Sequence, residues 1–303
     1  MKRKASVTLT IITLFLGSLF ATAAMAAGHG HAAGHAKAGE KGPAILLVTF
    51  GTSIPKAQAA FANIDARVKK AFPGVEVRWA YTSHIIRKKL AGEGKLLDSP
   101  EVALAKLMDE GYAKVAVQSL HMIPGFEFHD IYTNAKMFER MAGGFDKVFV
   151  AFPMLSSDEA MEKVVKILPG AMIPRDRTPG DAVILMGHGT HHTSDAIYSA
   201  MMYKFQNADP NIYVGTVEGH PSFDDIKGML LKKGIRKAYL MPFMSVAGDH
   251  AINDLAGDEA DSWKSMLTQA GITCIPVLTG LAEVDALADL WIENLQTAMK
   301  HLQ

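Results

Sequence analysis

The feature that most constrains the fold is an alternation, from Pro43 onward, of short apolar, β-branched runs with amphipathic helical stretches. Strands joined by helices over short connections form parallel sheets that helices cover on both faces. The predicted strands are Ala44–Phe50, Val75–Tyr81, Lys114–Ser119, Lys147–Ala151, Ala182–Met186, Ile212–Val217, Lys237–Pro242 and Ile272–Leu278. The predicted helices are Ser53–Phe72, Ser99–Gly111, Asp158–Leu168, Thr193–Gln206, Ser222–Lys233, Asp258–Ala270 and Val284–His301. The pattern predicts the α/β class.

The two halves of this pattern resemble each other. Ile45–Thr52 and Ile184–Thr190 each combine an apolar strand with a final Gly-Thr pair. Two later strands each end near a proline and lead to a histidine, His129 in the first half and His250 in the second. This weak duplication, which is not a short-period repeat, predicts two similar lobes.

A segment rich in proline, glycine and charge, residues 169–181, separates the halves and is typical of a linker. We therefore expect an N-terminal lobe at 43–168 and a C-terminal lobe at 182–303, each a parallel sheet flanked by helices. Ligands of open α/β sheets bind beyond the carboxyl ends of the strands. The active-site cleft is expected between the lobes, with the metal site on the C-terminal lobe.

The N-terminus has the features of a secretory signal peptide, residues 1–26. Basic residues 2–4 precede an uncharged apolar run at 7–21, and Ala24-Met25-Ala26 matches a cleavage site. Residues 27–42 are rich in glycine, alanine and histidine and are expected to form a flexible tail, which could bind metal weakly or be a plain linker. Later stretches are too short or too polar to span a bilayer, so we expect a periplasmic protein.

Charge and cysteine content exclude several classes. The chain has 31 basic and 31 acidic residues, and loss of the signal peptide would leave a net charge near −3. A nucleic-acid partner is not expected, because it would require a basic stripe. The single cysteine, Cys274, permits no intrachain disulfide.

Three motifs follow three consecutive strands of the second half: GHGTHH with His188, VEGHP with Glu218, and GDHAINDL with His250. Two imidazoles and a carboxylate suit Co²⁺, Ni²⁺, Fe²⁺ or Zn²⁺ and leave coordination positions open. Taken singly, each motif has a simpler interpretation: a solvated loop around His188, a helix cap at Glu218, and an N-cap at Asp249. Together they predict one metal site, with His188, Glu218 and His250 as ligands and catalytic groups.

These motifs, with LLVTFGTS near the start of the pattern and the longer string MPFMSVAGDHAINDL, resemble the anaerobic-type cobalt chelatases of cobalamin synthesis. The resemblance extends from Pro43 to the C-terminus. That family belongs to the class II tetrapyrrole chelatases, which share the ferrochelatase fold and need no ATP. The resemblance implies insertion of Co²⁺ into sirohydrochlorin, with His188 and His250 as metal-site histidines and Glu218 as their acidic partner. The signal peptide departs from the family, because cobalamin synthesis is expected in the cytoplasm.

The macrocycle requires apolar contacts and basic groups for its carboxylates. The predicted ring contacts are Phe50, Phe126, Met244, His129 and Arg87, and further apolar candidates near strand ends are Met122, Phe128, Met186, Met241 and Phe243. His129 could also be an axial ligand of a bound metallotetrapyrrole such as haem. For each there is a plainer alternative: ordinary core for the methionines, a solvated helix face for Arg87, and a surface role for His129.

Three alternatives to a cobalt chelatase remain open from the sequence. The first is an exported carrier of haem, another tetrapyrrole or a metal, which the signal peptide and the histidine-rich tail favour. The second is a chelatase that inserts Fe²⁺ for sirohaem, and Ni²⁺ is also a possible metal. The third is a two-lobed periplasmic solute-binding protein. The expected partners are a tetrapyrrole and a divalent metal, in a homo-oligomer.

Overall fold

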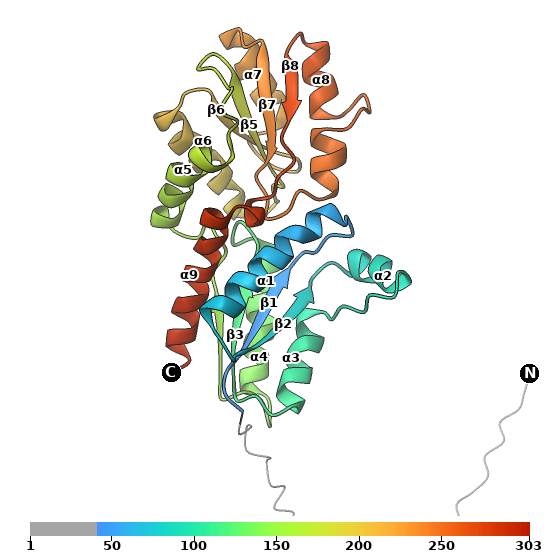
Figure 1. Cartoon of the computed structure of the whole chain (residues 1–303), viewed down its shortest axis with the longest axis vertical. Helices are drawn as coiled ribbons and strands as arrows, with labels where there is room; N and C mark the ends of the chain where they lie inside the picture. The colour runs from blue at the N-terminus through green and yellow to red at the C-terminus, as the bar shows by residue number, and fades with distance from the viewer. Residues whose placement is uncertain (1–40) are drawn as a thin grey trace, which may run out of the picture. The chain divides into compact units, whose positions relative to one another are not determined.

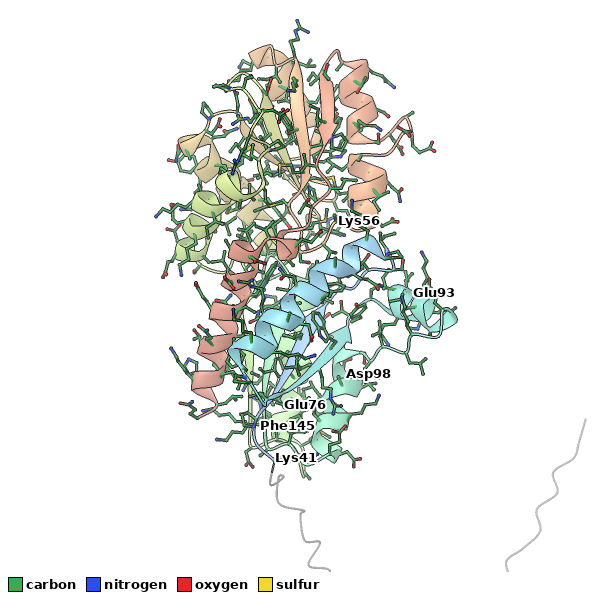
Figure 2. All side chains as sticks on the ribbon, in the orientation of Figure 1. Lys41, Lys56, Glu76, Glu93, Asp98 and Phe145 are labelled. Carbon is green, nitrogen blue, oxygen red and sulfur yellow. The ribbon has the colours of Figure 1, made fainter. Side chains whose placement is uncertain are left out.

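The computed structural model of the protein describes residues 41–303. The predicted signal peptide and nearly all of the predicted tail lie outside the described residues, so both stay predictions. The described chain enters the first lobe at Lys41, which is labelled in Figure 2. Lys41 pairs with Tyr112 in an isolated parallel bridge, and its Nζ lies 4.8 Å from the centre of the Tyr112 ring.

The first sheet is fully parallel and has the strand order β2-β1-β3-β4 (Figure 1). Its strands are β1 (Ala44–Thr49), β2 (Glu76–Tyr81), β3 (Lys114–Ser119) and β4 (Lys147–Ala151). The helices of this part of the chain are α1 (Ala59–Ala71), α2 (His84–Gly92), α3 (Pro100–Asp109) and α4 (Phe126–Arg140).

The second sheet is also parallel and repeats that order, as β6-β5-β7-β8. Its strands are β5 (Ala182–Gly187), β6 (Ile212–Thr216), β7 (Lys237–Pro242) and β8 (Thr273–Pro276). Its helices are α6 (Ala196–Ala208), α7 (Phe223–Lys233) and α8 (Trp263–Gln269), with a π-helical turn at Ala251–Leu255. The shared strand order confirms the prediction of two similar α/β lobes.

Local chemistry explains where many of these elements lie. Every residue of β1 and β5 is buried, as continuous apolar runs require in strands covered on both faces. At five helix starts a serine hydroxyl accepts a hydrogen bond from the backbone N–H three residues on: Ser83, Ser99, Ser157, Ser222 and Ser262.

Several predicted helices differ from the structure. Helices α2 and α4 were not predicted, although α4 buries Phe128, Ile131 and Ala135 at helical spacing. Helix α5 (Asp158–Met172) continues past the predicted linker start at 169 and includes Pro169, because Leu168 and Met172 are buried in the core. Helix α8 begins at Trp263, after the predicted start at Asp258.

The C-terminal helix, α9 (Asp285–His301), packs against β3 and β4 of the first sheet, and not against the second sheet that precedes it (Figure 1). Its buried stripe includes Leu287, Trp291 and Leu295, and Trp291 Nε1 donates to the His121 carbonyl over 3.4 Å. Conversely, α5 packs against α6 of the second lobe. The assignment of 182–303 to one lobe thus differs from the packing, because an amphipathic helix covers whichever sheet face is open.

The largest cluster of buried apolar residues contains side chains from both lobes, including Ile45 and Leu47 of β1 and Val183 and Leu185 of β5. Across residues 41–303, every helix is either too short or too polar to cross a membrane.

Candidate metal-handling site

The loops after β5, β6 and β7 begin level with one another. In the sheet register Gly187 of β5 lies beside Thr216 of β6, and Met186 lies beside Pro242 of β7. The β5–β6 pairing continues past the strand ends, because Glu218 N donates to the His188 carbonyl over 2.9 Å. The register therefore brings two of the motif-bearing loops, those of His188 and Glu218, side by side.

Glycine is required where these loops meet. Gly189 has a φ of +85°, and a Cβ at this position would lie 2.6 Å from the backbone nitrogen of Gly219. An L-residue would be strained by the dihedral and would also collide with the neighbouring loop. The Gly-His-Gly pattern thus lets the His188 loop pass close to the Glu218 loop.

The rings of His188 and His250 lie together, with centroids 4.7 Å apart and planes at 86°. His188 Nδ1 is 3.1 Å from the Gly189 carbonyl oxygen, and His250 Nδ1 is 2.5 Å from Oδ2 of Asp254. Since a carbonyl and a carboxylate can only accept, each Nδ1 carries the proton when the ring is neutral. Each Nε2 then has a lone pair that can bind a metal, and both side chains reach solvent, with 43% and 36% exposed.

Glu218 lies beside His188 but is less closely engaged. Its Oε2 is 3.9 Å from His188 Nδ1, the protonated nitrogen, and its side chain is 54% exposed. Within residues 41–303, no group of three His, Cys, Asp or Glu side chains is arranged to hold a metal ion. The structure therefore brings the two histidines together with Glu218 at their edge, and the three-residue ligand set stays a prediction.

A second group, from the first lobe, was missed by the sequence analysis. Glu127, in the first turn of α4, accepts a hydrogen bond from His121 Nε2 at 2.5 Å. His121 Nδ1 is 2.9 Å from the Ser119 hydroxyl, and the Thr82 hydroxyl lies 3.4 Å from Glu127. Ser119, His121, Glu127 and Thr82 thus form one polar network at the ends of β2 and β3.

The charge of Glu127 is linked to the second lobe. Burial raises the pKa of the Glu127 carboxyl, but the hydrogen bond from His121 and the nearby imidazole of His188 outweigh burial, and the net pKa is lowered. Glu127 is therefore a carboxylate at neutral pH, and the imidazole of His188 on the other lobe contributes to lowering its pKa. The signal in the sequence was weaker than for Glu218, because Glu127 comes eight residues after β3 ends at Ser119, whereas Glu218 comes two residues after β6 ends at Thr216.

Two of the predicted ring contacts, both on the first lobe, meet the second lobe at His192. Phe126 and His129 of α4 lie 5.0 and 5.1 Å, between ring centroids, from His192 of the GHGTHH motif. Phe126 is 58% exposed, and Phe50, at the end of β1, is 47% exposed. These two phenylalanines are available to a ligand, and His129 has His192 as its neighbour on the second lobe.

The methionine candidates are mostly core residues. Met244 is partly buried and packs against the core of the second lobe. Met186, Met241 and Phe243 are fully buried, as ordinary core packing requires. A direct contact between these three side chains and a ring would need the core to open.

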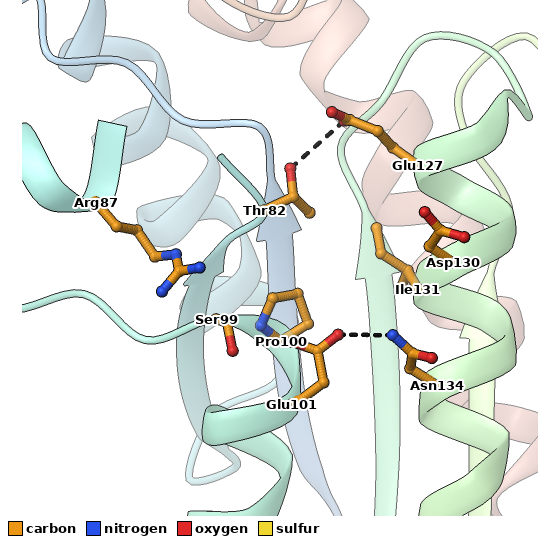
Figure 3. Close-up of a pocket in the computed structure, with 9 residues that line it drawn as sticks. All are labelled: Thr82, Arg87, Ser99, Pro100, Glu101, Glu127, Asp130, Ile131 and Asn134. Carbon is orange, nitrogen blue, oxygen red and sulfur yellow. Dashed lines mark hydrogen bonds between the residues drawn. The ribbon is translucent and has the colours of Figure 1, made fainter. Parts of the chain in front are cut away.

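Arg87 lines a polar pocket in the first lobe (Figure 3). The pocket has a volume of about 270 Å³ and is lined by Thr82, Arg87, Ser99, Pro100, Glu101, Glu127, Asp130, Ile131 and Asn134. In the described part of the chain, Arg87 Nε is buried without a hydrogen-bond partner. Three carboxylates share the pocket with Arg87, so its positive charge is offset within the pocket.

The fold is that of the two-lobed metal chelatases. Known structures with this fold include the sirohydrochlorin chelatase SirB of Bacillus subtilis subspecies spizizenii in complex with cobalt, with a TM-score of 0.57 at 15% identity. That match covers 86% of this chain and 97% of SirB. CbiX, described as the terminal enzyme of sirohaem biosynthesis in denitrifying bacteria, has a TM-score of 0.51 at 17% identity. That match covers 84% of this chain and 98% of CbiX.

Sequence similarity identifies the family. The chain belongs to the cobalt chelatase (CbiK) family, which matches residues 43–300. The sirohydrochlorin cobaltochelatase CbiKC of Nitratidesulfovibrio vulgaris is 40% identical over 85% of this chain and 91% of its own length. The sirohydrochlorin cobaltochelatase of Salmonella typhimurium is 34% identical over 84% of this chain and 96% of its own length. This membership confirms the resemblance drawn from the motifs and excludes the solute-binding alternative.

Proposed function

We propose that this metal chelatase inserts Co²⁺ into sirohydrochlorin without ATP, with His188 and His250 as the residues that deliver the metal. The observation that carries the proposal is the pair of adjacent imidazoles, each held through Nδ1 so that Nε2 is free to bind a metal. The names of the two relatives support the choice of metal and macrocycle.

The reaction exchanges one divalent ion for two pyrrole N–H protons. Imidazoles and carboxylates suit this exchange better than thiolates, because they bind a borderline metal without trapping it. His188 and His250 would hold Co²⁺ against one face of the ring. Glu218, exposed and free to rotate, would complete the ligand set as the metal arrives.

The two protons need acceptors. Glu127 is a carboxylate at neutral pH, because its pKa is lowered by His121 and His188. We assign Glu127, supported by His121, as the acceptor on the first lobe, and Glu218 as the acceptor beside the metal. The two carboxylates then belong to different lobes and would serve different pyrrole nitrogens.

The ring itself would contact residues near the lobe junction. The exposed Phe50 and Phe126 offer apolar contact, and Met244 could contribute its flexible thioether. His129 would lie at the edge of the ring. Arg87 would bind a carboxylate arm only if that arm outcompeted Glu101, which shares the pocket.

The test is spectroscopic and uses the purified mature protein with sirohydrochlorin and Co²⁺. Insertion changes the absorbance of the macrocycle. Loss of a residue that only orients a ligand costs about 10- to 100-fold, so His188→Ala and His250→Ala should lower the rate by about 100-fold or more. The matched control is His191→Ala, an exposed histidine of the same loop. Equal rates in wild type and both ligand variants would overturn the proposal.

The metal and the cellular location need separate measurements. Parallel rates with Co²⁺, Fe²⁺ and Ni²⁺ would identify the preferred metal, and we expect Co²⁺ to be fastest.

We also propose that residues 1–26 direct the protein to the periplasm, supported by the basic, apolar and small-residue pattern. Fractionation of cells expressing the full chain should place the cleaved protein there, and uncleaved protein in the cytoplasm would refute export.

A carrier of haem or another tetrapyrrole is the second candidate, favoured by the exposed His129 beside Phe126 and His192. An absorption spectrum of the protein as isolated would reveal a retained tetrapyrrole, and His129→Ala should then remove it.

We also propose a homo-oligomer, supported by the exposed aromatics Phe126, Tyr132 and Phe152. Light scattering of the mature protein would give the oligomeric state.

A further inference from the structure

We propose that Asp195 is a positioning residue that holds the loops of His188 and Glu218 in fixed relation, and so sets the affinity of the protein for Co²⁺. The inference rests on the proposed function of these two loops. Asp195 belongs to none of the motifs that carry the family resemblance, and its side chain hydrogen-bonds to backbone nitrogens of the two loops.

One carboxylate bridges the two loops. Asp195 Oδ1 accepts a hydrogen bond from the backbone nitrogen of Thr190 over 3.0 Å, two residues after His188. Its Oδ2 accepts one from the backbone nitrogen of His220 over 2.7 Å, two residues after Glu218. Hydrogen bonds to an ionised acceptor are roughly twice as strong as neutral ones. Each oxygen of Asp195 thus serves one of the two loops.

Asp195 ends the 3-10 turn Thr193–Asp195 that leads directly into α6. An aspartate just before a helix can accept a hydrogen bond from the first turn of that helix. Asp195 makes no such bond. Both oxygens are directed instead at the loops, so capping α6 does not explain the residue.

The cradle around Asp195 is tight. A Cβ added to Gly219 would lie 2.2 Å from Asp195 Oδ1, which leaves no room for a side chain between Glu218 and His220. The position of the Asp195 carboxylate and the path of the Glu218 loop therefore depend on each other. This fit explains the glycine of the VEGHP motif, which the sequence analysis left without a role.

The next turn of α6 supports the same loop from behind. Tyr198 is buried, and burial raises the pKa of its hydroxyl, although hydrogen bonds from the backbone at Gly189 and His188 oppose that rise. A Cβ on Gly187 would lie 2.3 Å from the Tyr198 ring. Tyr198 thus supports the His188 loop alone, whereas Asp195 joins that loop to the Glu218 loop.

This linkage has a specific consequence for the reaction. Residues that orient metal ligands usually contribute about 10- to 100-fold to metal affinity. Without Asp195, the two loops would still be joined by the backbone bond from Glu218 N to the His188 carbonyl. Thr190 and His220, however, would lose their shared acceptor. The side chains of His188 and Glu218 would then be held less firmly relative to each other, while the surfaces that contact the ring would be unchanged. The KM for Co²⁺ should therefore rise, and the KM for the tetrapyrrole should stay within about 2-fold of wild type.

The experiment compares Asp195→Asn with wild type and with Asp224→Asn, an exposed aspartate in the first turn of α7. The isosteric amide can accept from one loop but presents N–H groups to the other. Gly219→Ala is a second variant, because its methyl group would displace the Asp195 carboxylate from the opposite side. Hydrogen exchange of residues 187–192 and 217–221 is measured without metal, and Co²⁺ affinity and both KM values are measured separately.

We expect Asp195→Asn and Gly219→Ala to speed exchange in both segments by about 10-fold and to weaken Co²⁺ binding by about 10-fold or more. Asp224→Asn should match wild type in every measurement. Wild-type exchange rates and Co²⁺ affinity in both variants would overturn the positioning role while leaving the proposed function intact. Failure of the wild type itself to bind or insert Co²⁺ would instead refute the proposed function.

Discussion

Asp254 gives the sharpest test of how His250 is prepared to bind a metal. His250 Nδ1 lies 2.5 Å from Asp254 Oδ2, and the two residues are four positions apart on the π-helical turn. The carboxylate fixes the proton on Nδ1 and orients the ring. Replacing Asp254 with alanine removes both effects without changing Nε2, the nitrogen proposed to bind the metal.

The expected magnitude follows from the exposure of the pair. Such partners contribute about 10- to 100-fold to metal affinity, or about 1.4 to 2.7 kcal/mol. Both side chains of this pair are only partly buried, so water weakens the interaction and can replace part of it. We therefore expect Asp254→Ala to weaken Co²⁺ binding by about 10-fold, the lower end of the range.

The assay is a Co²⁺ titration of the purified protein in competition with a chromophoric chelator, followed by initial rates of insertion. Asp254→Asn should lie between alanine and wild type, because its amide oxygen can still accept from Nδ1. The matched control is Asp249→Ala, which removes a carboxylate that binds Asn253 in the same segment. Wild-type affinity in Asp254→Ala, or an equal loss in Asp249→Ala, would refute the reasoning.

Three further predictions concern stability and titration. Burial raises the pKa of Asp209, but the hydrogen bond from Arg177 lowers it, and the net pKa is below the usual value. Asp209→Asn should therefore cost about 1.5 kcal/mol of unfolding free energy at pH 7. That difference should shrink as pH falls below about 4 and Asp209 itself is protonated, and urea unfolding at several pH values would check it. Leu295→Ala in α9 should cost about 3 kcal/mol, because Leu295 is fully buried. A cost below about 1 kcal/mol in urea unfolding would contradict the packing of α9 on the first sheet. Burial raises the pKa of Tyr81 to about 12. Tyr81→Phe should therefore leave the number of tyrosines that ionise near pH 10 unchanged in an absorbance titration. The loss of one such tyrosine would show that the pKa of Tyr81 is normal.

The sequence predicted the repeated lobes well, because the signals for strands and for many helix starts are local. Continuous apolar runs required buried parallel strands, and the serines at 99 and 222 begin helices as expected. Helix α4 was missed although its buried residues have helical spacing. Its start lacks the serine cap that marks other helices, because Gly125 precedes it and makes no side-chain hydrogen bond.

The candidate site was predicted in part for a similar reason. His188, Glu218 and His250 each follow a strand, and the sheet register brings such positions to one edge. Their mutual geometry depends on the loops, and there the structure differs from the expected trio: the two rings meet, and Glu218 faces the protonated nitrogen of His188. The predicted roles of Phe50, Phe126, His129, Met244 and Arg87 stay predictions.

By itself, the sequence determined the class of fold, the position of the motif loops and the family, because these depend on periodicity, on turn residues and on short motifs. Only the tertiary structure decided which sheet α9 covers, that His188 on the other lobe helps to lower the pKa of Glu127, and that Asp195 joins two loops. Each of these relations links residues that are far apart along the chain, or joins loops whose spacing is set by packing. No local pattern specifies such contacts, because burial free energy rewards any apolar surface that fits, whatever its distance along the chain.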